Sequence, residues 1–307
     1  NTIIENFDFE NRDLTFADLS NLDLSQKNLE MANLEGANLS GTILPPDMKE
    51  MDLTGAKFIG TDLTNQNFTE SILDFAVFDE SRFGKIVLDR TYFIEADFRK
   101  IKDKTMEEVP PITGTSFAYA KLDGITLPKD LSAINFKGTE ARNADFSNSS
   151  IKITFFRETN LEGANFEGAD LTGNKFTSVL PLSYATKSIE EIMKYISPLP
   201  TISLLDLEVT DEEVLFHGYM FNLFFEANLI DANLSNADLS ISSFNSSDLT
   251  NANLSYSKMN RCDFALVNLT NANLEGADMQ ASYLANSILT NANLKGANLE
   301  GANLEGA

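Results

Sequence analysis

The sequence predicts an all-β solenoid whose four-sided coils stack into a rod. From Leu229 to Leu304 a large apolar residue, here called a centre, occupies every fifth position. Two places before each centre lies a smaller residue, mostly Ala or Ser, with Cys262 and Val267 as the largest. Because five is a multiple of neither 3.6 nor 2, the pattern fits neither an amphipathic helix nor an alternating strand. A short fixed period is typical of a stacked repeat.

A second period of 20 residues lies over the first. If four five-residue steps make one square turn, residues 20 apart lie above one another. Phe rings then stack in columns, and Asn side chains such as Asn233, Asn253, Asn273 and Asn293 form hydrogen-bonded ladders. The Phe residues predicted to define the core are Phe58, Phe78, Phe98, Phe136, Phe156, Phe176, Phe224, Phe244 and Phe264.

The centre and the small residue are expected to point inward, while the other three positions of each repeat face water. The whole chain then forms about 12 coils, a rod of roughly 55–60 Å at the ~4.8 Å spacing of neighbouring strands. We divide it into a looser first part (1–177), an insertion (178–215) and a regular last part (216–307).

Three shorter interruptions fall within the first part, at 45–48, 99–115 and 128–131. The first and third share a Leu-Pro-x-Asp-apolar core, and the second is charged and ends in Val109-Pro110-Pro111. Because proline cannot donate to a strand ladder, both short segments are predicted to bulge out at a corner of the solenoid. They are either tolerated loops or paired contact loops.

The insertion is predicted to be partly helical, near 186–215. Ser188 followed by Glu191 forms a capping box, and the apolar residues after it have helical spacing. A short helix is expected from about 189 to 196, ending before Pro198. Thr210 with Glu213 is a second, weaker capping signal. The insertion could pack back on the solenoid, form a dimer contact or present a binding face.

Composition excludes several classes of function. The net charge of −23, from 23 basic and 46 acidic residues, opposes direct binding of nucleic acid or an anionic membrane. It suits a basic partner, or serves only to keep a long β-surface soluble. Cys262 and His217 are each the one residue of their type, so we expect no disulfide framework, no metal site, no catalytic triad and no cofactor.

Neither a membrane-spanning segment nor a signal peptide is evident in the sequence. The chain starts at Asn1 and stops in mid-repeat at Ala307, so both ends look cut.

Catalysis within these residues is not expected. Carboxylates such as Asp18, Asp238 and Asp278 occupy an ordinary outward position of the repeat, without the desolvated pocket that shifts a pKa. The glycines are turn residues of repeats rather than a phosphate-binding loop. Cys262, in an inward position, is expected to be a buried, inert thiol, and His217 to be structural.

The motif Ala-(Asp/Asn)-Leu-x-x, repeated in 227–307, 32–39 and 164–171, resembles the pentapeptide-repeat family. The resemblance covers about four fifths of the chain and implies a right-handed quadrilateral β-helix. The family's best understood members are bacterial proteins that resemble B-form DNA and bind DNA gyrase. This chain lacks the helix and apolar tail with which those proteins commonly dimerise.

Three functions follow as expectations: a non-catalytic protein-interaction scaffold, preferred here; a β-helix module of a bacterial secreted effector, attached to a ubiquitin-ligase-like domain in some relatives; and a DNA mimic that binds gyrase. The partner is a protein, with gyrase or a host protein as candidates. The location is the bacterial cytoplasm, or a host cell for an effector. The candidate partner-binding residues are Pro45, Pro46, Asp47, Pro128, Lys129, Asp130, Glu190, Glu191 and Lys194.

Overall fold

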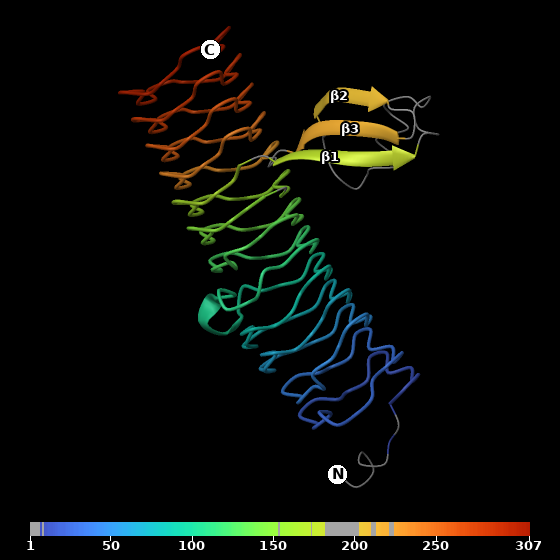
Figure 1. The fold of residues 1–307 in the computed structure, drawn as a ribbon. Helices are drawn as coiled ribbons and strands as arrows, with labels where there is room; N and C mark the ends of the chain where they lie inside the picture. The colour runs from blue at the N-terminus through green and yellow to red at the C-terminus, as the bar shows by residue number, and fades with distance from the viewer. Residues whose placement is uncertain are drawn as a thin grey trace.

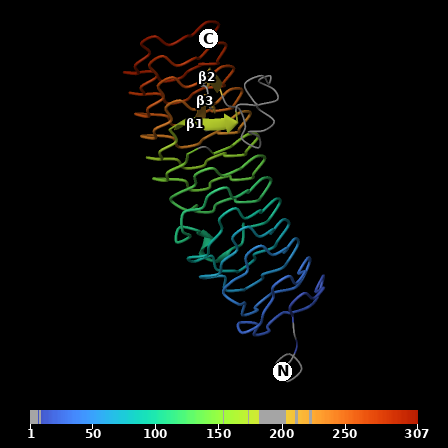
Figure 2. The ribbon, with the colours of Figure 1, turned by 45° about the vertical axis from the view of Figure 1, so that its right-hand side comes forward.

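The described coils stack into a rod, with the N-terminal coils at one end and the C-terminal coils at the other (Figure 1; Figure 2 shows the same rod turned). A computed structural model describes residues 7, 9–152, 154–172 and 224–307, and the backbone of 174–181, 203–209 and 213–220. Parallel bridges join positions 20 residues apart around the coils, as between Asn253 and Asn273. The predicted four-sided β-helix is confirmed.

Each side of a coil consists of an inward small residue, an outward residue that bridges to the next coil, and an inward centre. Two turn residues follow, of which the second has a positive φ, as at Asn251 (φ 59°). The next small residue donates its N–H back to the centre, as from Ala252 to the Leu249 carbonyl (3.0 Å). This hydrogen bond joins residues three apart, and the residue just before its donor has the positive φ. These are the features of a type II β-turn, which favours Gly and Asn at the positive-φ position.

The outward position favours Asp and Asn because their side chains complete this turn. Asp248 Oδ1 accepts the N–H of Thr250 at 2.9 Å, which is an Asx turn. The amide nitrogens also link neighbouring coils: Asn253 donates to Asn233 and Asn273 to Asn253, both at 3.2 Å, and Asn293 donates to Asn273 at 3.0 Å. The predicted Asn column is confirmed.

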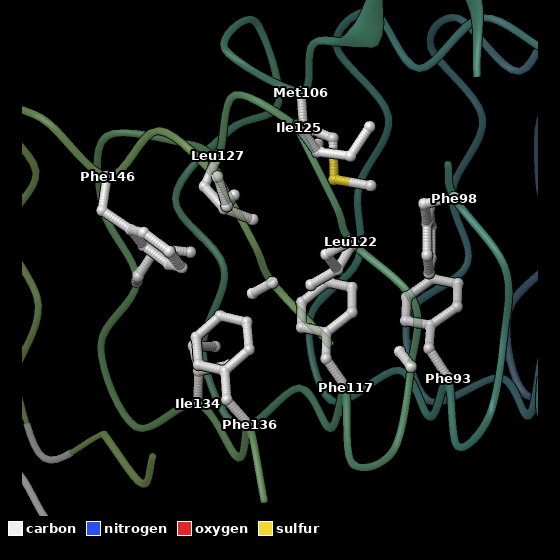
Figure 3. Packing of buried hydrophobic residues seen from close by; sticks show 14 of the residues in the cluster. Phe93, Phe98, Met106, Phe117, Leu122, Ile125, Leu127, Ile134, Phe136 and Phe146 are labelled. Atoms are coloured by element: carbon white, nitrogen blue, oxygen red, sulfur yellow. The ribbon is translucent and has the colours of Figure 1, made fainter. Parts of the chain in front are cut away.

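The interior is filled by apolar side chains, with Phe rings in columns. Figure 3 shows Phe93, Phe117 and Phe136 following one another along the rod. The longest column has ring centroids 4.5–5.5 Å apart and planes within 9° of parallel. Its members are Phe93, Phe117, Phe136, Phe156, Phe224, Phe244 and Phe264. A second column stacks Phe58, Phe78 and Phe98.

One predicted stacking partner was wrong. The ring that stacks on Phe156 belongs to Phe224, at 4.7 Å, and not to Phe176. Phe176 lies instead in strand β1, where the chain has already left the coils. The 20-residue count is correct within each uninterrupted run, but it does not carry across the insertion.

The insertion is a small antiparallel sheet of β1 (Asn174–Pro181), β2 (Ser203–Val209) and β3 (Glu213–Met220), in the order β1-β3-β2. It projects from one side of the rod (Figure 1). It therefore extends from 174 to 220 rather than from 178 to 215, and His217 belongs to β3. The second capping signal was wrong, since Glu213 begins a strand. The helix expected at 189–196 lies outside the described residues, and the part that is described contains no α-helix.

The segments 45–48 and 128–131 do not bulge out, contrary to expectation. Met48 and Leu131 are themselves buried centres and pair with the next coil, donating to Asn67 O (2.8 Å) and Ser150 O (2.9 Å). Each nine-residue interval is therefore two sides, one of them shortened by one residue. In the charged interruption, the 3-10 helix η1 (Lys102–Lys104) widens one coil, and the bridge after it spans 24 residues, from Tyr92 to Ser116.

Candidate functional site

Apolar side chains fill the described interior of the rod. Within the residues that the structure describes, no group of three or more His, Cys, Asp or Glu side chains could hold a metal ion. Cys262 is buried against the Leu239 carbonyl (Sγ to O 2.9 Å), and burial raises the pKa of its thiol to about 12. No helix in the described ranges is long and apolar enough to cross a bilayer. Any recognition by these coils must use their outer surface.

The outer surface consists of four faces, each formed by one column of outward residues. Face 2 runs from Asp18 to Ile288, face 3 from Asp23 to Asn293, and face 4 from Asp47 to Asn298. Turn residues form the edges between them. Face 1 carries Asp13, Asn33, Asp52, Ile72, Tyr92, Ser116, Asn135, Phe155, Ser243, Asp263, Tyr283 and Asn303.

Face 1 differs from the others in its apolar side chains. Ile72 and Tyr92 are adjacent in its ladder and are 37% and 47% exposed, and Tyr283 is 46% exposed higher up the same face. Phe155 is half-buried between them. On faces 2 and 3 the exposed apolar residues are scattered singly, such as Ile43 and Ile288. Exposed apolar side chains gathered on one face are typical of a contact surface.

The edge from face 1 to face 2 extends this apolar surface. Phe75 and Tyr119 occupy the second turn position there, with φ of 58° for both, and are 52% and 43% exposed. Left-handed backbone is unfavourable for large side chains, so aromatic residues at these positions are retained at some conformational cost. We define the apolar patch as Ile72, Phe75, Tyr92, Ile94, Tyr119 and Phe155. Ser116 and Asn135 lie between Tyr92 and Phe155 on the face, and Glu95 lies between Phe75 and Tyr119 on the edge.

Acidic side chains border this patch on the side of the N-terminal coils, here called the lower rod. Between residues 10 and 95, face 1 and its two edges carry ten acidic and three basic side chains. These are Glu10, Asp13, Glu30, Glu35, Glu50, Asp52, Glu70, Asp74, Asp89 and Glu95 against Arg12, Lys49 and Arg90. Two of the bases are already paired, Lys49 with Asp47 (3.0 Å) and Arg90 with Glu70. The surface therefore attracts cations.

The opposite side of the same coils is nearly neutral. Face 3 and its edges, between residues 20 and 108, carry seven acidic and six basic side chains. These are Asp23, Asp62, Asp79, Glu80, Asp103, Glu107 and Glu108 against Arg82, Lys85, Arg99, Lys100, Lys102 and Lys104. The acidic excess of the lower rod thus lies mainly on the side of face 1.

Asp74 lies at the N-terminal end of the patch, in the same coil as Ile72 and Phe75. Its Oδ1 accepts the N–H of Ile94 at 2.8 Å. Burial raises the pKa of this carboxyl, and the charge of Asp52 adds to the effect. A cation placed over the patch would therefore meet a partly desolvated carboxylate, where its attraction is stronger than in bulk water.

The described residues predicted from sequence as contacts form two separate groups, with Pro45, Pro46 and Asp47 at one shortened corner, where they line a cleft, and Pro128, Lys129 and Asp130 at the other. Pro45 and Pro128 are buried at the two shortened corners, and Asp47 is exposed on face 4. Lys129 lies 3.7 Å from Glu107. Glu190, Glu191 and Lys194 lie outside the described residues. The outward carboxylates behave as ladder members: Asp18 accepts the N–H of Ser20, and its hydrogen bonds to Ser20 lower its pKa.

The apolar patch was missed by sequence reasoning. A signal existed, since Ile72 and Tyr92 lie 20 residues apart in the outward position. The later members Tyr119 and Phe155 are displaced from that count by the widened coil and the shortened corner. Only a correct register through both irregularities assigns them to the same side.

A family model described as pentapeptide repeats matches residues 1–44, 47–84, 154–179, 227–265, 247–284 and 268–306, in 8 copies. These ranges cover more than half of the chain. The chain belongs to the pentapeptide-repeat family.

Solved pentapeptide-repeat proteins are similar to it only distantly. HetL, a heterocyst differentiation regulation protein of the cyanobacterium Nostoc, is 22% identical, covering 85% of this chain and 86% of HetL at a TM-score of 0.32. QnrB1, a plasmid-mediated fluoroquinolone resistance protein, is 17% identical over 76% and 89%, at 0.34. A thylakoid-lumen protein of Arabidopsis thaliana is 22% identical over 54% and 66%, at 0.24. No curated protein matches the chain.

Proposed function

We propose that this pentapeptide-repeat protein is a non-catalytic scaffold that binds a basic, partly apolar protein surface through face 1. The observation that carries the proposal is the apolar patch within an acidic border. Apolar contacts supply most of the binding free energy, and the surrounding carboxylates select a cationic partner and accelerate its approach.

The position of the inserted sheet also supports face 1 as the binding side of the rod. The coils are interrupted after Leu171, a centre of face 4, and resume at Phe224, a centre of face 1. The β1–β3 sheet therefore leaves the rod at the edge that borders face 1, near Phe155. As part of the proposal, this sheet adds a second contact element beside the patch.

The charge distribution favours a scaffold over a DNA mimic. A mimic of the phosphate backbone needs an acidic surface that is continuous along the rod. Here the acidic surface is interrupted in the middle coils, where residues 96–172 carry 12 acidic and 10 basic side chains. Carboxylates are also paired there and further along the rod, as Asp170 with Lys152 and Asp238 with Lys258. An effector module and a location in the bacterial cytoplasm remain compatible with the proposal.

Cross-linking from single positions tests the surface. A photoreactive phenylalanine analogue would replace Tyr92 on face 1 or, as the matched control, Thr126 on face 3. In an extract of the source cells, a discrete covalent adduct should form from position 92 and not from position 126. Adducts of equal yield from both positions would refute face 1 as the binding surface.

A pair of exposed substitutions provides the second arm. Tyr92→Lys should abolish that adduct when the analogue is placed at Ile72, because it inserts a charge into the apolar patch. Thr126→Lys should leave the adduct unchanged. Circular dichroism should show both variants folded, since neither side chain is buried.

A further inference from the structure

The lower rod contains a break in its hydrogen-bond ladder. On regular coils, centre and turn N–H groups donate to the next coil, as Met48 does to Asn67 O (2.8 Å) and Glu50 to Thr69 O (3.0 Å). In the described part of the chain, no hydrogen bond joins residues 28–33 to residues 45–51. Pairing resumes at Leu34, whose N–H donates to Asp52 O at 3.3 Å.

A cleft of about 810 Å³ occupies this break, on face 4 and the edge towards face 1. One wall consists of residues 27–33 and the other of residues 45–47 and 49–52. Among the described residues, the N–H groups of Leu29, Met31, Asp47 and Asp52 have no acceptor. The walls therefore present unpaired ladder groups from two coils to the same space.

The shortened corner explains the break. Between Leu44 and Met48 one turn residue is missing, whereas the coil below takes a full five-residue step from Leu24 to Leu29. Sides of unequal length cannot stay in register. At the other shortened corner the coil below is itself irregular, and Ile112 still donates to Asp130 O at 3.5 Å. The cleft thus arises because one coil lacks a turn residue and the coil below it is not shortened to match.

The chemistry of the cleft identifies its occupant. Unpaired N–H and C=O groups of a strand edge bind an extended backbone by strand addition. Four carboxylates and two lysines, Lys27 and Lys49, line the cleft. Lys49 is paired with Asp47 (3.0 Å), whereas Glu30, Glu50 and Asp52 form no salt bridge among the described residues. Met31, 77% exposed, offers a flexible apolar contact at the mouth. An extended segment with alternating cationic and apolar side chains satisfies all three features.

We propose that this cleft is a second binding site, which accepts an extended, basic segment of a partner protein as an added β-strand. The inference rests on the proposed role in protein binding, and it adds a site that recognises backbone rather than a surface. Its occupant pairs with the 28–31 wall and extends towards face 1, so one partner can engage both sites.

The first test measures hydrogen exchange at single amides in the free protein, and it asks whether the ladder is open at the cleft. In the free protein the amides of Leu29 and Met31 should exchange faster than those of Leu249 and Asn251, which donate to Asn268 O (2.8 Å) and Thr270 O (2.9 Å) in regular coils. Equal protection at both pairs would mean that the ladder is closed, and would overturn the proposal.

The second step uses a defined probe, an N-acetylated hexapeptide of alternating lysine and valine. It should slow exchange at Leu29 and Met31. The same hexapeptide with N-methyl groups on alternate residues keeps every side chain but cannot donate along one edge, and it should fail to protect them. Equal protection by both peptides, or protection only elsewhere on the rod, would overturn strand addition in the cleft.

Charge is tested with matched variants. Glu30→Gln with Glu50→Gln should weaken probe binding about tenfold, whereas Glu167→Gln with Glu226→Gln, in exposed turns of other coils, should not. Equal affinity in both variants would overturn the charge selection. A doubled molar mass in solution, with Leu29 and Met31 already protected, would assign the cleft to a second copy of this chain instead.

The result can be separated from that for face 1. Probe failure with retained cross-linking from position 92 would remove the cleft and leave the proposed function intact. Probe binding without specific cross-linking from position 92 would leave the cleft as a binding site and remove face 1 as the binding surface.

Discussion

Replacing Phe224 by alanine should open the rod where the inserted sheet leaves it. Phe224 is the first centre after the insertion, it is fully buried, and its ring stacks on Phe156 at 4.7 Å and on Phe244 at 4.5 Å. Truncating a buried Phe costs about 3–5 kcal/mol, and each lost stacked pair adds up to about 1 kcal/mol where the cavity does not relax. We expect a local loss of about 4 kcal/mol.

Hydrogen exchange is the appropriate assay, because a repeat rod opens locally and a single unfolding free energy is poorly defined. Amides of the adjoining coils, such as Leu161 and Leu229, should exchange up to about 1,000-fold faster. Amides near Leu39 should be unchanged, since they lie several coils away.

The neighbouring residue provides the control. Phe225 is half-buried on the outer edge, with the guanidinium of Arg157 5.3 Å from its ring. Phe225→Ala should cost only about 1 kcal/mol. If both variants accelerated exchange to the same extent, the Phe column would not be what joins the coils on the two sides of the insertion.

The remaining predictions concern single side chains. Because burial raises the pKa of the Cys262 thiol to about 12, the native protein should not react with a thiol reagent at pH 8, although the unfolded chain should; rapid native labelling would contradict the inward assignment. Gly276→Ala should lower the melting temperature more than Gly296→Ala does. Both have positive φ, which costs about 1 kcal/mol, but only at Gly276 would the new Cβ meet a side chain, the Tyr256 ring at 2.6 Å; equal shifts would show that this ring moves aside freely. Hydrogen bonds from Arg99 lower the pKa of Asp97, so this carboxylate adds stability above its unfolded value of about 4, and the gain is lost as the pH falls through the folded value. Arg99→Gln should therefore raise the pKa of Asp97 in an NMR titration, and an unchanged value would refute the assigned cause.

The sequence determined the solenoid because its repeat is local. The turn, the Asx bond and the inward centre are all set within about seven residues, as in Asp248 to Leu254, so the pattern itself specifies each side of a coil. Columns such as Asn233 to Asn293 followed from the 20-residue count. The nature of the outward residues was likewise readable one repeat at a time.

Only the tertiary structure decided which residues share a side of the rod. Every change of step length, at 45–48, 99–115 and 128–131, and above all the insertion before Phe224, shifts the register of all later coils. A count along the chain placed Phe176 over Phe156, and it could not assign Tyr119 and Phe155 to the patch with Ile72. The cleft also depends on register, because it arises where a shortened side lies over a full one. The local pattern specifies each repeat. The shifts of register from all the irregular steps add up along the rod, and the total shift decides which residues lie on the same face.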